Sequence, residues 1–269
     1  MLRPRIIPCL LLQNGGLVKT RQFTDPTYVG DPLNTVRIFN EKEVDEILVL
    51  DIEASRKGLE PNYELISQIA AECRMPLTYG GGIKHVEHVE RIVSLGVEKV
   101  AISSEAVYNP DIVTAAANKV GSQSVSAVLD VRICSNHEYS VFTHNGINST
   151  NQRPEELASK LESAGAGELV INSIDRDGVG NGYDIELVAK IRNACNIPIT
   201  VLGGAGCIED IKKLILNYPV IGASAGSLFV FRGKYRAVLI NYPDNKIKNS
   251  LINTCYSEPA NPLKRTKRN

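Results

Sequence analysis

Acidic residues stand at the ends of several apolar segments of this 269-residue chain. Asp51 and Asp130 each close a run rich in Val, Ile and Leu, and Asp175 and Asp177 follow a third run. A carboxylate can take up or release a proton, so carboxylates gathered at one edge of a fold suit general acid–base catalysis. The alternative is that each aspartate caps the loop or helix that follows it. For Asp130 alone the two interpretations stay equally open.

Two glycine-rich turns recur at a constant offset and indicate phosphate binding. Gly203-Gly204 lies 122 positions after Gly81-Gly82, and Ala225-Gly226 lies 122 positions after Ser103-Ser104. Such turns present backbone N–H groups, which bind phosphate without a basic side chain. One copy could simply let the chain turn, but two copies in register favour a ligand with a phosphate at each end. The predicted contacts are Gly81, Gly82, Ser103 and Ser104 in one half, and Gly178, Gly203, Gly204, Ala225 and Gly226 in the other.

Charged residues also begin four of the apolar segments, with alternating sign: Arg5, Glu46, Lys99 and Glu168. Paired charges are tolerated at the inner end of a barrel, where such a set would form a plug. By spacing alone, simple exposure at strand starts is the favoured interpretation. A further basic residue, Lys19, opens a long segment, 19–30, that fits a mobile lid over the opposite end. A lone lysine there is more often simply solvated.

The elements that would position these groups alternate regularly between strand and helix. The segments expected to be strands lack polar alternation, as strands buried on both faces do; they are 5–11, 46–51, 77–80, 99–102, 124–130, 168–172, 199–202 and 220–223. Helical periods cover 62–73, 85–95 and 184–195, and Pro110 and Pro154 stand where helices begin. This order predicts an α/β fold, a (β/α)₈ TIM barrel built from two half-barrels. An eighth helix is unclear; 233–242 could form a short one, and the residues after Pro243 receive no assignment.

Composition narrows the class of protein. The formal net charge is zero, which favours neither nucleic acid nor an anionic membrane as partner. We expect a barrel over 1–243 and a basic, mobile tail over 244–269, where Lys264, Arg265, Lys267 and Arg268 gather; polyanion binding by this tail is the weaker alternative. The six cysteines show no metal-ligand spacing, so we expect reduced thiols, no metal and no cofactor. Neither a secretory signal nor a membrane-spanning run is evident, which predicts a cytoplasmic protein.

Several blocks of the sequence resemble HisF, the cyclase subunit of imidazole glycerol phosphate synthase. The resemblance runs from residue 1 to about residue 231, and two blocks within it are specific, the one ending at Glu168 and Ser173-Ile-Asp-Arg-Asp-Gly178. It implies a barrel that receives ammonia from a HisH-like glutaminase docked as a heterodimer at the N-terminal face. It also implies roles for individual positions: an ammonia gate at Arg5, Glu46, Lys99 and Glu168, docking at Glu98, catalysis at Asp130, and substrate contacts at Lys19, Asp51 and Asp177.

One departure from the resemblance changes the expected function. Leu11 occupies the position where the family carries its first catalytic aspartate, and leucine cannot transfer a proton. Segment 133–151 and the end of the chain also depart from the pattern. These features resemble a second HisF paralogue associated with surface-polysaccharide genes, thought to work with a HisH-like glutaminase and an ATP-dependent sugar amidotransferase. The expectation is therefore ammonia delivery for amidination of a bacterial sugar. The alternatives are a working cyclase of histidine biosynthesis and a non-catalytic scaffold.

Overall fold

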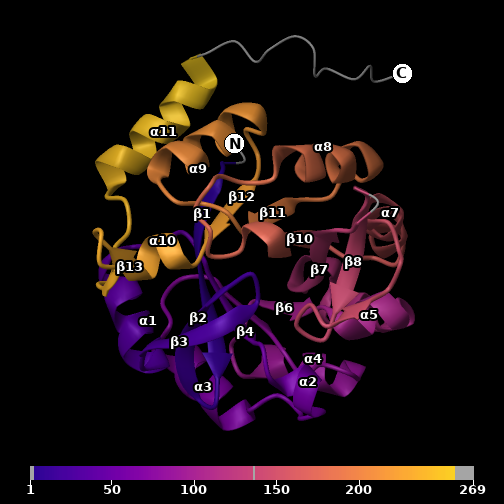
Figure 1. Cartoon of the computed structure of the whole chain (residues 1–269). Coiled ribbons are helices and arrows are strands. Elements are labelled where there is room, and N and C mark those ends of the chain that lie inside the picture. The colour runs from indigo at the N-terminus through magenta and orange to yellow at the C-terminus, as the bar shows by residue number, and fades with distance from the viewer. Residues whose placement is uncertain (1–2, 136, 258–269) are drawn as a thin grey trace.

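Eight parallel strands close into a barrel in the described part of the chain. The computed structural model describes residues 3–135 and 137–257, with side chains to residue 253 (Figure 1). The hydrogen-bonded order runs from β1 through β4, β5, β6, β7, β10, β11 and β12 back to β1. The barrel strands are β1 (Arg5–Gln13), β4 (Ile47–Asp51), β5 (Leu77–Gly80), β6 (Lys99–Ile102), β7 (Val125–Ile133), β10 (Glu168–Ser173), β11 (Ile199–Leu202) and β12 (Gly222–Ala225). The predicted TIM barrel is thereby confirmed.

The strands form where the sequence has continuous β-branched and aliphatic runs. Residues 77–80, 99–102 and 199–202 are strands with the predicted bounds. The last strand begins two residues later than predicted, at Gly222, which pairs with Arg5 of β1 and Thr200 of β11. Val220 remains 47% exposed in the preceding turn and therefore contributes nothing to the barrel wall.

Seven helices of nine or ten residues cover the outside of the barrel (Figure 1). They are α1 (Pro32–Glu41), α3 (Tyr63–Glu72), α4 (Val86–Ser94), α6 (Asp111–Val120), α7 (Pro154–Ser163), α8 (Ile185–Ala194) and α9 (Ile208–Asn217). Asp31, Asn62 and Asp184 accept backbone N–H groups at the starts of α1, α3 and α8, which satisfies donors that a helix leaves unpaired. The short elements α2 (Ala54–Lys57), α5 (Ser104–Tyr108), α10 (Ser227–Val230), η1 (Ser122–Ser124) and η2 (Ile174–Arg176) lie between strands and helices.

Two antiparallel extensions of the barrel strands occupy the segments for which the sequence suggested a lid and an irregular loop. Strands β2 (Gly16–Arg21) and β3 (Thr24–Gly30) continue from β1, so the segment predicted as a mobile lid is a hairpin. Strands β8 (Tyr139–Thr143) and β9 (Asn148–Ser149) continue from β7 within 133–151. Val141 and Thr143 of β8 are fully buried, which anchors this second extension.

The C-terminal region corrects two expectations. Residues 233–242 form no helix, because a small hairpin of β13 (Phe231–Arg232) and β14 (Ala237–Val238) occupies this region. Helix α11 (Asn245–Ser257) then packs against α9 as the eighth outer helix (Figure 1). Lys248 of α11 donates to the backbone oxygen of Glu43 at 2.9 Å and pairs with Asp45 at 3.1 Å. The predicted tail therefore starts with a docked helix, and its basic cluster at 264–268 lies outside the described residues.

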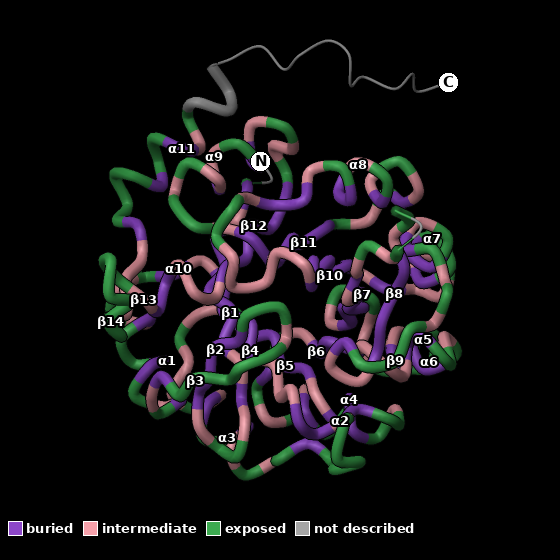
Figure 2. The backbone as a smooth tube through the Cα atoms, viewed as in Figure 1, coloured by how far each residue is buried: buried purple, intermediate pink, exposed green. Residues whose placement is uncertain are grey.

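The apolar residues form two separate clusters. The larger one fills the space between the barrel wall and the helices. In Figure 2 the buried residues lie largely along the barrel strands. The smaller one lies inside the barrel and comprises Ile7, Cys9, Leu48, Ala101, Val128, Val170 and Leu202, with Leu11 and Leu50 packed against it. Side chains therefore fill the middle of the barrel, and polar groups are confined to its two ends.

The cysteines and the helix lengths bear on two expectations drawn from composition. Cys9, Cys73, Cys134, Cys195 and Cys207 carry free thiols, whereas the side chain of Cys255 lies outside the described residues. Among helices in the described ranges, none combines the length and the apolar character that crossing a membrane requires.

Candidate functional site

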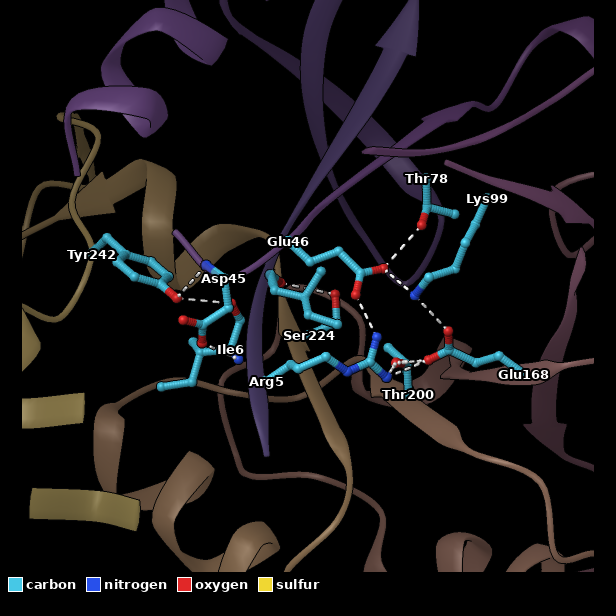
Figure 3. Close-up of polar contacts among 11 residues, drawn as sticks. Arg5, Ile6, Asp45, Glu46, Thr78, Lys99, Glu168, Thr200, Ser224 and Tyr242 are labelled. Atoms are coloured by element: carbon cyan, nitrogen blue, oxygen red, sulfur yellow. Dashed lines mark hydrogen bonds and ion pairs between the residues drawn. The ribbon is translucent and has the colours of Figure 1, made fainter. Parts of the chain in front are cut away.

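Four charged side chains form a closed ring at the N-terminal end of the barrel (Figure 3). Arg5 bonds Glu46 through one guanidinium nitrogen and Glu168, at 2.6 Å, through another. Lys99 bridges the same two carboxylates at 2.7 and 2.8 Å. The structure therefore brings the four predicted residues together, with positive and negative charges alternating around the ring. The interpretation that these charges are simply exposed is wrong, because the two glutamates are less than 10% exposed.

Two hydroxyl groups add hydrogen bonds to the carboxylates of the ring. Thr78 donates to Glu46 at 2.9 Å, and Thr200 donates to Glu168 at 2.6 Å (Figure 3). Burial by itself raises the pKa of Glu168, but Arg5 and Lys99 outweigh that effect and bring it to about 2. Glu168 is therefore ionised throughout the physiological range. Glu98, the predicted docking residue, precedes Lys99 at the same end and is exposed.

The opposite end of the barrel opens into a cavity with an empty volume of about 1100 Å³, its mouth included. The cavity lies at the carboxyl ends of the strands, where the catalytic groups of TIM barrels are placed. All predicted substrate-site residues line it: Lys19, Asp51, Gly81, Gly82, Ser103, Ser104, Asp130, Asp177, Gly178, Gly203, Gly204, Ala225 and Gly226. Leu11 also lines it, where a carboxylate would be required for a second proton-transfer group. Asp175 lies outside the lining and accepts the backbone N–H of Ile133 at 2.8 Å.

Asp130 is the carboxylate best suited to proton transfer. Its oxygens accept hydrogen bonds from Asn172 Nδ2 at 3.0 Å and Ser103 Oγ at 3.5 Å. Burial raises the pKa of Asp130 to about 6, although both hydrogen bonds act in the opposite direction. A group with a pKa near neutrality can both accept and return a proton, which general acid–base catalysis requires.

The titration of Asp130 should appear as a pH-dependent stability difference. Its folded pKa lies above the unfolded value of about 3.9, so ionisation destabilises the folded state progressively from about pH 4 through pH 6. Asp130→Asn cannot ionise. We expect its free energy of unfolding to rise relative to that of the parent between pH 4 and pH 7 and then to level off. Urea unfolding at several pH values measures this; a pH-independent difference would contradict the assignment.

Lys19 is buried in the wall of the cavity, not solvated. Its side chain is 4% exposed, and its ammonium donates to the backbone oxygen of Cys9. Burial lowers the pKa of Lys19, while Cys9 and Asp177 act to raise it. Asp177 accepts from Thr20 Oγ1 at 2.7 Å and from the backbone N–H of Phe23 at 3.3 Å, so it ties the β2–β3 hairpin to the cavity rim.

Asp51 both caps the turn that follows its strand and lies in the cavity, so it fits the two interpretations given for the acids at strand ends. One of its oxygens accepts the backbone N–H groups of Glu53 and Ala54, each at 3.0 Å, and so caps the turn into α2. The residue also lines the cavity. Burial raises the pKa of its carboxyl despite these two hydrogen bonds.

Asn172 is a cavity residue that the sequence argument did not single out. It is 4% exposed, and its Oδ1 atom has no hydrogen-bond partner among the described residues. The available signal was its position: residues 168, 170 and 172 of one strand share a face, and Glu168 on that face had already been assigned inward.

The glycine turns line the cavity, and their backbone conformation requires glycine. Gly81 and Gly203, the equivalent residues of the two halves, have φ values of +128° and +92°. A Cβ atom would lie 2.6 Å from the backbone oxygen of Asp51 in the first case and of Ser173 in the second. Both turns therefore need glycine for conformation and close approach, whether or not they bind phosphate.

Gly203→Ala is expected to lower the free energy of unfolding by about 2–4 kcal/mol, because strain at positive φ adds to overpacking against a backbone oxygen. Gly233→Ala is the matched control: Gly233 has φ +73°, but a Cβ there meets nothing within 4 Å. We expect it to cost about 1 kcal/mol, the conformational part alone. Denaturant unfolding of the two variants compares them; equal losses would show that the close contact relaxes freely.

In the described ranges, no three His, Cys, Asp or Glu side chains are grouped so that they could hold a metal ion. The cavity brings several ionisable and backbone groups of the protein together. They are one carboxyl with a pKa near neutrality, a buried lysine, further carboxylates, and two sets of turns on opposite sides of the cavity.

Comparison with known proteins places the chain among relatives. The family model for "Histidine biosynthesis protein" matches residues 5–236. A Leptospira interrogans protein named "Putative imidazole glycerol phosphate synthase subunit HisF" is 54% identical over 253 residues, 94% of this chain and 100% of that protein. The similarly named hisF2 of Pseudomonas aeruginosa is 54% identical over 248 residues, 92% and 99% of the two chains. The imidazole glycerol phosphate synthase subunit HisF of Hyphomonas neptunium is 39% identical over 231 residues, 86% and 91%.

Proposed function

This chain belongs to the histidine biosynthesis protein family and, within it, to the HisF-type subunits, and from that premise we propose that it receives ammonia in a glutamine-dependent amidotransferase. A HisH-like glutaminase docks at the N-terminal face, beside Glu98, as the second subunit of a heterodimer. Ammonia passes the charged ring and reaches the cavity at the other end. The complex works in the cytoplasm.

The observation that carries this proposal is the closed ring at the end of the barrel opposite the cavity (Figure 3). Two buried carboxylates, held by two partly buried cations, close this end of the barrel at a large desolvation penalty, although well-packed apolar side chains often close such an end equally well. Their retention is understandable if the ring also gates the passage of a small molecule. The desolvation penalty is then tolerated because the ring controls passage as well as closing the barrel.

Leu11 determines which chemistry we propose at the cavity. Imidazole ring closure in the HisF family is expected to use aspartates at both the Leu11 and the Asp130 positions, and this chain keeps one of them. We therefore propose amidination of a bacterial surface sugar, with an ATP-dependent sugar amidotransferase as a further partner. The phosphorylated small molecule bound between the glycine turns belongs to the same reaction.

Histidine biosynthesis is the second candidate, favoured by the 39% identity to an imidazole glycerol phosphate synthase subunit and by the cavity positions of Lys19, Asp130 and Asp177. The reaction would yield imidazole glycerol phosphate and AICAR. Losing one proton-transfer group costs roughly 10²- to 10⁴-fold in rate, about 3–5 kcal/mol. A purely structural scaffold, the third candidate, gains no support from a large cavity lined by ionisable groups.

A cyclase assay separates the first two candidates. The purified chain is mixed with a HisH-type glutaminase, glutamine and the ribulosyl formimino substrate of histidine synthesis, and an aspartate-bearing HisF serves as positive control. We expect negligible cyclisation by this chain. Turnover comparable to that of the control would establish the histidine pathway instead.

A further inference from the structure

The loop that leads from η2 into α8 carries part of the second set of glycine turns, and a pair of charged side chains holds it. Arg176 Nε lies 3.6 Å from Asp184 Oδ2, and another guanidinium nitrogen donates to the backbone oxygen of Gly182 at 3.1 Å. Asp184 is only 3% exposed. Arg176 is not part of the cavity lining, although the next two residues, Asp177 and Gly178, are. Any influence of Arg176 on the cavity therefore passes through the backbone of the loop.

Tyr139 of β8 adds a third member to this pair. Its hydroxyl donates to Asp184 Oδ1 at 3.0 Å, and the same oxygen accepts the backbone N–H of Leu187 in the first turn of α8. Burial and the charge of Asp184 raise the pKa of Tyr139, so its hydroxyl keeps the proton and remains a donor. One buried carboxylate thus joins β8, the loop and α8. We call Arg176, Asp184 and Tyr139 the Asp184 brace.

The braced loop packs backbone to backbone against the next glycine turn. The N–H of Gly182 donates to the oxygen of Gly204 at 2.8 Å. A Cβ atom on Gly204 would lie 2.2 Å from the oxygen of Gly182, and one on Gly206 would lie 2.3 Å from the oxygen of Gly180. The position of the 203–206 turn therefore depends on the loop that precedes α8.

The first half of the barrel lacks the ion pair of this brace. At the offset of 122 that relates the two halves, Arg176 corresponds to Ala54 and Asp184 to Asn62. The correspondence extends to structure, because Asn62 caps α3 as Asp184 caps α8. Asn62, however, is exposed and neutral, and Ala54 can form no ion pair. A β/α unit of this barrel therefore folds without the pair, which calls for an explanation specific to the second half.

A brace raises the affinity of a glycine-rich anion site. Residues 178–182 include three glycines, all with positive φ, and glycine loses more conformational freedom on ordering than any other residue. If the loop were unrestrained, a bound phosphate would have to order it, and the free energy of ordering would weaken binding. Backbone N–H groups that are already in place bind the anion without that loss.

We propose that Arg176, Asp184 and Tyr139 are positioning residues for the second set of glycine turns, on the side of Gly204, and that this set is the stronger of two phosphate sites. The weaker site is the first set, on the side of Gly82. A ligand with a phosphate at each end is then anchored in the second half of the barrel. That the turns bind phosphate rests on the proposed function; the inequality of the two sets rests on the brace.

Titration of the full chain with inorganic phosphate tests the inference. The backbone amide resonances of Gly204 and Gly82 in proton–nitrogen correlation spectra report on the two sets separately. In the parent, the Gly204 resonance should reach half-saturation at a lower phosphate concentration than the Gly82 resonance. Arg176→Ala should raise the half-saturating concentration at Gly204 by about tenfold, the effect of losing about 1.4 kcal/mol, and leave that at Gly82 unchanged.

Arg132→Ala is the matched control. The side chain of Arg132 is 34% exposed, against 33% for Arg176, and its ion pair is with Asp175, at 3.8 Å, in place of Asp184. This variant should change neither half-saturating concentration. Tyr139→Phe keeps the ion pair and removes one hydrogen bond, so a smaller rise of about two- to fivefold is expected, at the second set alone.

A Gly204 resonance that does not respond to phosphate, or that responds equally in the parent and in Arg176→Ala, would overturn the inference. A parent in which Gly82 saturates first would overturn it as well. If Arg176→Ala does not fold, the same comparison with Tyr139→Phe decides the matter. The titration uses neither a glutaminase nor an acceptor of ammonia, so the inference and the proposed amidotransferase function can fail separately.

Discussion

Leu11→Asp is expected to give this barrel measurable cyclase turnover, roughly 10²- to 10⁴-fold above that of the parent, if both sets of glycine turns bind phosphate as we propose. The change returns a proton-transfer group to the cavity that already holds Asp130 and Lys19, and one such group contributes a factor of this size. The measurement is turnover of the ribulosyl formimino substrate with ammonia supplied in solution, which removes any dependence on the glutaminase.

Leu11→Asn is the control for this gain, because it has the size and polarity of aspartate but cannot transfer a proton. Activity in the aspartate variant alone would identify Leu11 as the residue that silenced ring closure. If the aspartate and asparagine variants are equally inactive, the cavity has diverged beyond this one position, and the sugar-modifying function gains weight.

Lys99→Ala is expected to lower the free energy of unfolding by about 3–5 kcal/mol, since it leaves two buried carboxylates with one cationic partner. The surface pair Lys119–Glu90, at 3.2 Å and about half exposed, provides the control. Lys119→Ala should cost at most about 1 kcal/mol. Denaturant unfolding at neutral pH compares the two losses; equal losses would mean that the ring contributes no more than a surface ion pair.

Acid should reduce the stability that the ring confers. The folded pKa of Glu168 is about 2, below its ordinary value of about 4.3, so this contribution is complete above pH 4.3 and is lost as the pH falls toward 2. In Lys99→Ala the pKa of Glu168 should rise, and this acid-dependent part of the stability should shrink.

With a glutaminase and an acceptor present, the complex that contains Lys99→Ala should consume more glutamine per product formed, because the gate is incomplete.

The barrel could be predicted from the sequence because its strands carry the signal locally. Residues 77–80, 99–102 and 199–202 are short apolar runs between helical periods, and their bounds follow from composition alone. The β8 strand could not be found this way. Its buried residues Val141 and Thr143 stand in a polar segment, and only pairing with β7 makes them part of a sheet.

The C-terminal region was missed for a related reason. Tyr242 donates a hydrogen bond to the backbone oxygen of Ile6 at 2.8 Å, and Lys248 donates to Glu43 and Asp45; these contacts join residues that are 203 to 236 positions apart in the sequence. No local period encodes such partners. They place α11 beside α9, whereas the sequence pattern alone indicated a tail.

In the candidate site, too, some features could be predicted from local sequence and others depend on contacts between distant segments. The acids at strand ends and the glycine turns could be found from residue type and spacing, because parallel strands bring their carboxyl ends to one face. The burial of Lys19 and the free oxygen of Asn172 depend on three-dimensional neighbours: the first follows from the β2–β3 hairpin, the second from the pairing of β7 with β10. For the ring, spacing favoured exposure, and only the closed barrel brings the four charges into contact.

The measurement that tests the central claim most directly is the rate of glutamine hydrolysis by a HisH-type glutaminase, taken from the same genome, as this chain is added. If the chain receives ammonia from a docked glutaminase, the rate should rise and saturate at one chain per glutaminase, and Glu98→Lys should shift saturation to higher concentration. A rate that stays flat at every ratio, with no complex on gel filtration, would contradict the account.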